Sequence, residues 1–178
     1  MDQIFAPWRI EWVERDDEGD DGCPFCRLPE VGDDRETRIV ARGEHAFVLL
    51  NNYPYNPGHA MVIPDRHVGD YADLGEAELL SHARVKQRTL RACRAALDPD
   101  GANAGLNLGG AAAGGSIDDH VHEHVVPRWA GDTSFMPVVG DTKVIVEALE
   151  DTYDRLHAAF DEQAGTDSTG TGAVGLPV

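Results

Sequence analysis

Three histidines separated by single residues, His120, His122 and His124, are the residues of this chain best suited to chemistry. Side chains alternate between the two faces of an extended strand, so the three imidazoles would leave one face with neighbours roughly 7 Å apart. A neutral imidazole is a nucleophile, a proton carrier and a metal ligand near pH 7. The spacing predicts a site on one face of a sheet, although a solvated polar strand or an accidental metal-binding tract has the same pattern.

A run of small residues precedes the histidines. Residues 109–116 read Gly-Gly-Ala-Ala-Ala-Gly-Gly-Ser. Glycine tolerates positive φ, and small residues let backbone amides approach an anion closely. A phosphate group is therefore a candidate ligand of this run.

The segment from Gly114 to Phe135 resembles the histidine triad family of nucleotide hydrolases and transferases, whose signature is His-φ-His-φ-His-φ-φ with φ apolar. Glu123 departs from this signature at the second φ position. Its side chain is expected to point away from the histidines, so the departure affects the packing of the strand more than the chemistry. Further segments resemble the branch of the family that contains diadenosine tetraphosphate phosphorylases, and the resemblance covers about residues 6 to 160. These segments are residues 6–9, 49–67 and 127–132.

This resemblance implies a catalytic role for each of three histidines. His122 would be the nucleophile that attacks the α-phosphorus and forms a nucleotidyl-histidine, which phosphate or water then cleaves. His124 would face the phosphate oxygens and stabilise charge or assist the leaving group. His59 would lie close to the triad, with a polar residue at a strand end as the alternative interpretation.

The resemblance also implies a substrate-binding set, in which Asn51 contacts the ribose and Leu49 and Phe47 flank the base unless both are simply core residues. Arg128 would supply local positive potential. Phosphate oxygens would be held by Ser116 and by the amides around Gly115. The hydrolases of the family have glutamine at the position of Ser116, so this serine argues against plain hydrolysis. Ser116, Arg128 and Trp129 together favour the phosphorylase-like branch.

Two other functions remain open at the level of the sequence. The same nucleotidyl-histidine chemistry occurs in phosphoramidases of the family, which cleave nucleoside phosphoramidates. A regulatory protein that binds a nucleotide without cleaving it is a third possibility, but simple binding does not require a nucleophile.

Cys23 and Cys26 form a Cys-x-x-Cys pair, which in an acidic chain that is not expected to be secreted indicates a metal or redox pair rather than a disulfide. Tetrahedral zinc needs two more ligands, and the chain has no second Cys-x-x-Cys. In zinc-containing relatives these ligands correspond to His67 and His120. We therefore expect one structural zinc ion, with two semi-buried thiols as the alternative.

Acidic residues dominate the composition. There are 32 Asp and Glu against 15 Lys and Arg, only Lys86 and Lys143 are lysine, and the formal net charge is -17. A field of this sign repels phosphate backbones, so nucleic acid is an unfavourable partner. A carboxylate-rich, lysine-poor surface is typical of proteins that work in molar salt, and we expect a halophilic, haloarchaeal source. A protein from such a source should lose its structure on dialysis into dilute buffer, and full retention of structure and activity would count against this hypothesis.

The 178 residues, 42% of them hydrophobic, predict one α+β domain. Short apolar segments predict strands over 39–41, 46–50, 60–64, 105–109 and 119–127, and three- and four-residue periodicity predicts two main helices over 74–97 and 142–163. The domain is expected to span residues 1–163, with an N-terminal zinc-binding segment over 1–38 and a flexible tail over 164–178. The resemblance adds a sheet of about five antiparallel strands and a homodimer. The sequence shows neither a membrane-spanning run nor a signal peptide, so a cytoplasmic location is expected.

Overall fold

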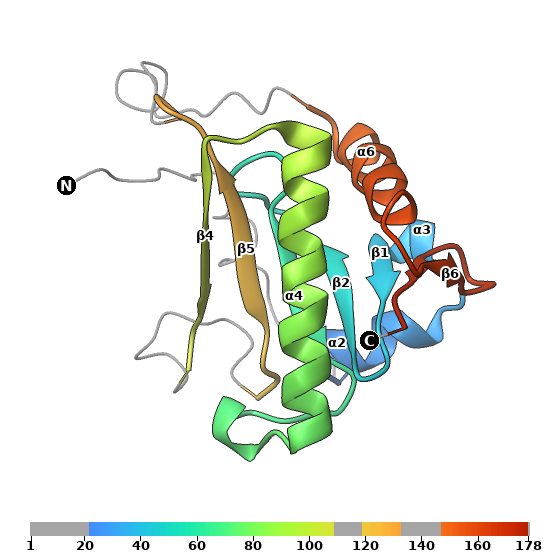
Figure 1. Ribbon diagram of the computed structural model, residues 1–178. Helices are drawn as coiled ribbons and strands as arrows, with labels where there is room; N and C mark the ends of the chain where they lie inside the picture. Colours follow the sequence, from blue (N-terminus) through green and yellow to red (C-terminus); the bar gives the residue numbers. More distant parts are fainter. Residues whose placement is uncertain (1–21, 109–118, 133–146, 178) are drawn as a thin grey trace.

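A computed structural model describes residues 22–108, 119–132 and 147–177, and the structural statements below concern these residues (Figure 1). Two long helices pack against a sheet, and the other described helical segments are only three or four residues long. The helical elements are α2 (Pro24–Arg27), η2 (Leu28–Glu30), α3 (Asp34–Thr37), η3 (Tyr71–Asp73), α4 (Glu76–Leu97) and α6 (Leu149–Asp161). The strands are β1 (Ile39–Arg42), β2 (Ala46–Leu50), β3 (Ala60–Pro64), β4 (Gly101–Leu106), β5 (Glu123–Arg128), β6 (Asp167–Ser168) and β7 (Val174–Gly175).

The seven strands form one sheet in the order β4-β5-β3-β2-β1-β7-β6. Strands β1, β2 and β3 form the predicted antiparallel meander, with Leu50 opposite Ala60 at the turn that contains the Asn/Pro/Gly segment. Strand β5 pairs with β3, so that Met61 lies opposite His124. The sheet thus brings the turn near His59 and the histidine run onto neighbouring strands.

The prediction of about five strands is wrong because β6 and β7 extend the sheet beyond β1. The prediction of a flexible tail over 164–178 also disagrees with this arrangement. Val174 lies opposite Ala41 in a parallel pairing, and the Leu176 amide donates to the Arg42 carbonyl at 2.7 Å. Strands of two residues are too short to show an alternating pattern, so no periodicity of the sequence predicts them.

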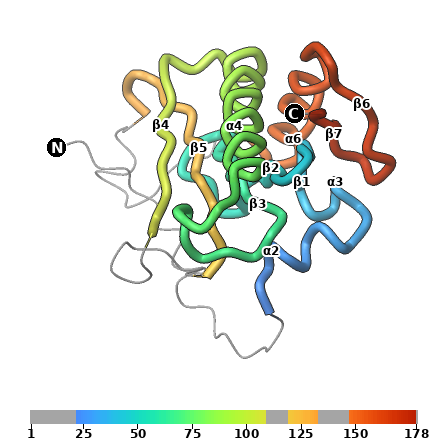
Figure 2. Tube along the Cα trace, turned by 60° about the horizontal axis from the view of Figure 1, so that its bottom comes forward, coloured from blue at the N-terminus to red at the C-terminus, as the bar shows by residue number. Residues whose placement is uncertain are grey.

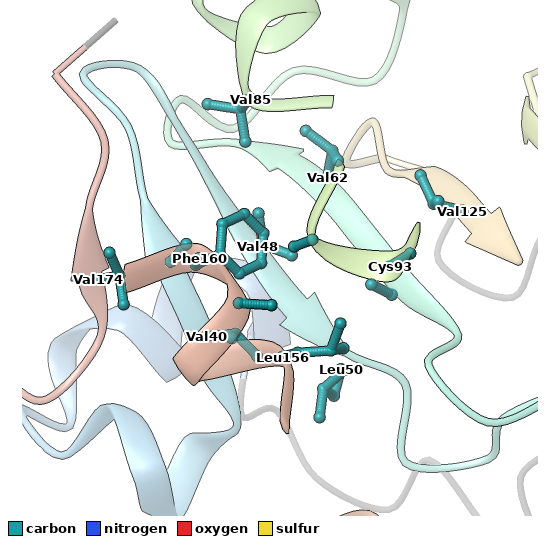
Figure 3. Close-up of a cluster of buried hydrophobic side chains, with 14 of the residues drawn as sticks. Val40, Val48, Leu50, Val62, Val85, Cys93, Val125, Leu156, Phe160 and Val174 are labelled. Carbon is teal, nitrogen blue, oxygen red and sulfur yellow. The ribbon is translucent and has the colours of Figure 1, made fainter. Parts of the chain in front are cut away.

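Helices α4 and α6 cover one face of the sheet and correspond to the two predicted helices (Figure 1). The described residues also form the short helices α2 and α3, which were not predicted. Figure 3 shows the core between the two long helices and the sheet, where Phe160 and Leu156 of α6 lie beside Val40 and Val48 of the sheet. Helix α6 begins at Leu149 in the structure, whereas residues 142–146 of the predicted helix lie outside the described residues. No described helix combines the length and the apolar character needed to cross a bilayer.

The opposite face of the sheet carries the N-terminal helix α2, and in Figure 2 the strands run between α2 and α4. The alternation of side chains sends Phe47 and Leu49 of β2 and Met61 of β3 to this second face, where they pack with Phe25 of α2. The histidines described below lie on this face.

Two strand boundaries differ from the prediction. Strand β4 runs over Gly101–Leu106 rather than 105–109, and five of its six residues are exposed, so no buried alternation marks it. Strand β5 begins at Glu123, so that His120 and His122 precede the regular strand rather than lying within it.

Candidate active site and metal cluster

The three histidines of the run lie on the α2 face of the sheet. The ring of Phe25 contacts both His120 and His122, at centroid distances of 5.6 and 5.1 Å, and the ring centroid of His124 lies 5.1 Å from that of His122. His120 and His122 are buried, whereas His124 is half-buried. The expected common face is therefore confirmed.

Hydrogen bonding fixes the orientation and tautomer of His122. Its Nδ1 lies 2.8 Å from the backbone oxygen of His120, and because a carbonyl oxygen only accepts, Nδ1 carries the proton. Burial lowers the pKa of His122, so the ring is neutral near pH 7. In the neutral ring the lone pair then lies on Nε2. His122 is thus prepared to act as a nucleophile through Nε2.

A second hydrogen-bond chain reaches His124. The Tyr55 amide donates to Nδ1 of His59 at 3.1 Å, so the proton of neutral His59 lies on Nε2. This nitrogen is 2.9 Å from Nδ1 of His124 and donates to it. The proton of neutral His124 is consequently on Nε2. His59 is almost completely buried and stacks on the Tyr55 ring at 4.9 Å, which holds the chain in place. His124 therefore presents a donor suited to a phosphate oxygen.

A cluster of four potential metal ligands lies beside these hydrogen-bonded histidines. It consists of Cys23, Cys26, His67 and His120. One ligand atom from each residue lies within 4.8 Å of all the others. His120 Nδ1 is 3.2 Å from the Cys23 sulfur and 3.6 Å from that of Cys26, while His67 Nδ1 is 3.3 Å from the Cys26 sulfur. Nitrogen and sulfur ligands bound tetrahedrally to zinc at ordinary bond lengths lie about 3.3–3.8 Å apart. The cluster is close to that size.

The tautomers of the two histidines also suit a metal. His120 Nε2 donates to the Pro64 carbonyl at 2.8 Å, and His67 Nε2 lies 3.4 Å from a carboxylate oxygen of Asp119, which leaves both Nδ1 atoms directed into the cluster. Burial and the neighbouring Cys23 raise the pKa of Cys26 to about 11. Two thiolates side by side therefore require a cation, and the donor set fits zinc.

Comparison with known proteins agrees with this geometry. The HIT domain family matches residues 33–131. The chain is 40% identical over 159 residues to a Mycobacterium tuberculosis protein named AP-4-A phosphorylase, covering 85% of this chain and 80% of that protein. The chain belongs to the histidine triad (HIT) family. A crystal structure of a Zn-bound HIT protein from Mycobacterium smegmatis matches with a TM-score of 0.64 and 31% identity, covering 79% of this chain and 94% of that one. The crystal structure of a hypothetical histidine triad nucleotide-binding protein from Sulfolobus tokodaii matches with a TM-score of 0.60 and 28% identity, covering 79% of this chain and 90% of that one.

The expected base-flanking residues of this HIT protein lie within the core of the α2 face. Phe47 has no exposed surface and Leu49 is 4% exposed. In this conformation both side chains pack in the hydrophobic cluster with Phe25, which agrees with the alternative that they are core residues. Asn51 is also buried, where its Oδ1 accepts from the Tyr53 amide and its Nδ2 lies 3.5 Å from the Met61 sulfur.

Of the substrate-binding residues predicted to bind the phosphates or supply positive potential, Arg128 is the one that the structure describes. Gly115 and Ser116 lie outside the described residues. The Arg128 guanidinium donates to both carboxylate oxygens of Asp132 and to Asn103. This pairing lowers the pKa of Asp132 and neutralises much of the positive potential that Arg128 was expected to supply.

Sequence reasoning missed the residues that orient the histidines. These are Phe25, Tyr55 and Asp119 around the site, and a polar cluster behind it. Phe25 was signalled only by its place between the two cysteines. The polar cluster was signalled by Glu123, whose buried carboxylate accepts from Lys86 of α4 at 3.0 Å and lies 3.7 Å from Nδ1 of His82. As expected, the side chain of Glu123 points away from the histidines.

Proposed function

We propose that this HIT protein cleaves dinucleoside polyphosphates at the α-phosphorus through a nucleotidyl-His122 intermediate, with diadenosine tetraphosphate as the first substrate to test. The hydrogen bond from His122 Nδ1 to the His120 carbonyl carries the proposal, because it leaves the nucleophilic lone pair on Nε2. The 40% identity to an AP-4-A phosphorylase supports the substrate class.

In the first step, His122 Nε2 attacks the α-phosphorus, an N–P bond forms and the P–O bond to the rest of the polyphosphate breaks. Nδ1 keeps its proton, so the ring of the intermediate is cationic and remains bonded to the His120 carbonyl. The Nε2–H of His124 stabilises the negative charge on the phosphate oxygens. From diadenosine tetraphosphate the leaving group is ATP.

In the second step, an oxygen of phosphate or water attacks the same phosphorus. The N–P bond breaks, its electron pair returns to Nε2 and His122 becomes neutral again. Phosphate as acceptor gives ADP, and water gives AMP. One difficult displacement is thereby replaced by two easier ones.

We further propose that Cys23, Cys26, His67 and His120 hold one zinc ion. A closed four-ligand zinc site supplies structural stability rather than a reactive water. His120 links this cluster to catalysis, because the same residue offers Nδ1 to the cluster and its backbone oxygen to His122. The ligand set would thus keep the acceptor of the His122 proton at a fixed position.

The decisive experiment compares the products of diadenosine tetraphosphate cleavage with and without inorganic phosphate. ADP that forms only with phosphate identifies phosphorolysis, and AMP without phosphate identifies hydrolysis. His122→Ala should abolish both while leaving zinc content and the circular dichroism spectrum unchanged. His157→Gln, on α6 across the sheet, is the histidine control and should retain activity.

Two results would redirect the assignment. Faster turnover of adenosine phosphoramidate than of the dinucleotide would favour a phosphoramidase. Tight nucleotide binding without turnover of either compound would favour the regulatory alternative. An active His122→Ala variant would contradict every version of the nucleotidyl-histidine mechanism.

A further inference from the structure

The basic side chains of this acidic chain differ in whether a carboxylate pairs with them. Among the described residues, many basic side chains lie in ion pairs with Asp or Glu. These are Arg35, Arg38, Arg42, Arg66, Lys86, Arg128 and Arg155. Arg84, Arg88 and Arg91 of α4 form no ion pair with any carboxylate of the described residues, although acidic residues outnumber basic ones 32 to 15.

These three arginines share one side of α4 because they are spaced by four and three residues. Together with Gln87, Gln163 and Ala164 they line a hollow of ≈ 420 Å³. Helices α4 and α6 lie side by side (Figure 1). Gln163 and Ala164, which follow α6, form the second wall of the hollow. Like charges at this spacing repel each other, so an arrangement without a counter-ion is unfavourable.

Arg88 is built into the wall of the hollow. It is 8% exposed, and it donates through Nε to the Gln163 side chain at 3.1 Å and through a terminal nitrogen to the Ala164 carbonyl at 2.9 Å. Gln163 in turn donates to the Arg88 backbone oxygen at 3.0 Å. Burial, together with the charge of Arg91, lowers the pKa of Arg88. A buried guanidinium fixed in this way is pre-organised for an oxyanion.

We propose that Arg84, Arg88 and Arg91 form a binding site for a phosphate-type oxyanion, either inorganic phosphate or the phosphate group of a small metabolite. The lining supplies guanidinium and amide donors, and none of the described residues that line the hollow is an aromatic residue on which a base could stack. The hollow is larger than a single phosphate ion and can accommodate a phosphate monoester. The site lies on the α4 face of the sheet, whereas the histidines lie on the α2 face, so it is independent of the proposed reaction.

The test is equilibrium binding of radiolabelled inorganic phosphate to the zinc-loaded protein at constant ionic strength. Arg91→Gln should weaken the affinity about tenfold, the loss expected for one charge-assisted hydrogen bond. The double variant Arg84→Gln/Arg91→Gln should lose the site. Arg94→Gln is the matched control, because Arg94 is an exposed arginine of α4 that is absent from the lining, and its affinity should stay within about twofold of the parent.

Competition with glycerol 3-phosphate separates the two sources of the anion. Displacement shows that the site accepts phosphate monoesters, whereas binding of inorganic phosphate alone restricts it to the free ion. Phosphate bound at the triad is not affected by the α4 variants, so the difference between variants isolates the hollow. Equal phosphate binding by the parent and the double variant would overturn the proposal, as would equal effects of Arg91→Gln and Arg94→Gln.

Discussion

Replacing Lys86 by methionine tests how the chain tolerates a carboxylate within its histidine strand. Glu123 is 5% exposed, and its Oε1 accepts from Lys86 Nζ at 3.0 Å. Its other oxygen and Nδ1 of His82 face each other at 3.7 Å without a hydrogen-bond partner in the described structure. Burial lowers the pKa of His82, so the ring is neutral and offers no compensating charge near pH 7. Lys86→Met would leave the carboxylate buried and without its cation.

The expected cost follows from this geometry. Unit charges 3.0 Å apart attract by about 5 kcal/mol at an effective dielectric constant near 20. The side chain of Lys86 is 32% exposed, so solvent screens part of this energy and reaches the carboxylate once the cation is removed. We therefore expect a loss of about 2–3 kcal/mol in the free energy of unfolding, below the ~3–5 kcal/mol typical of a fully buried pair.

Urea denaturation of the zinc-loaded protein measures this loss. Lys86→Arg keeps the charge and should lose less than about 1 kcal/mol. Glu123→Gln removes the other charge, and in the double variant the two losses should overlap by about 1–2 kcal/mol. A Lys86→Met variant within about 0.5 kcal/mol of the parent, or strictly additive losses, would refute the assignment of Lys86 as the partner of the buried carboxylate.

Three further predictions concern the histidine chains, the metal cluster and the C-terminal strands. His59→Ala should lower kcat about 10–100-fold without loss of zinc, because His124 loses the donor that fixes its tautomer; steady-state kinetics with metal analysis measures both, and an unchanged kcat would contradict the chain. Cys26→Ser should lose zinc and destabilise the fold, as followed by metal analysis and thermal unfolding, whereas Cys93→Ser, which changes the buried cysteine of α4, should retain zinc. Asp34 is buried, but hydrogen bonds from Arg42, Thr171 and Ala173 outweigh this desolvation and lower the pKa of its carboxyl. Its stabilising contribution is therefore present above the unfolded pKa near 4 and is lost as pH falls through the lower folded value. Asp34→Asn should lower the free energy of unfolding by about 2–4 kcal/mol at pH 7 and reduce the dependence of that free energy on pH in the acid range. An unchanged acid dependence, measured by unfolding at several pH values, would contradict this linkage.

Much of the site was predictable because local sequence determines it. The period of two placed the histidines on one face, and the resemblance to known zinc-containing relatives joined the two cysteines to His67 and His120, which the structure brings together. The meander of β1 to β3 and helix α4 were also predictable, since their apolar positions follow regular spacings.

The remaining features depend on contacts between distant residues. The tautomer of His122 is determined by a backbone oxygen, and that of His124 by His59, 65 residues earlier in the chain. Strand β7 joins the sheet partly because the buried Asp34 binds the amide of Ala173, and no pattern within residues 164–178 reveals this. Phe47 was expected to flank the base, but an apolar residue in a strand serves a core or a ligand equally well, and only burial distinguishes them.

The central claim is that His122 carries a nucleotidyl group during turnover. Mass spectrometry of protein quenched during cleavage of diadenosine tetraphosphate should detect one adenylyl group attached to His122, and the adduct should disappear when phosphate is added as acceptor. Rapid turnover with no adduct at any quench time, together with an active His122→Ala variant, would contradict the account.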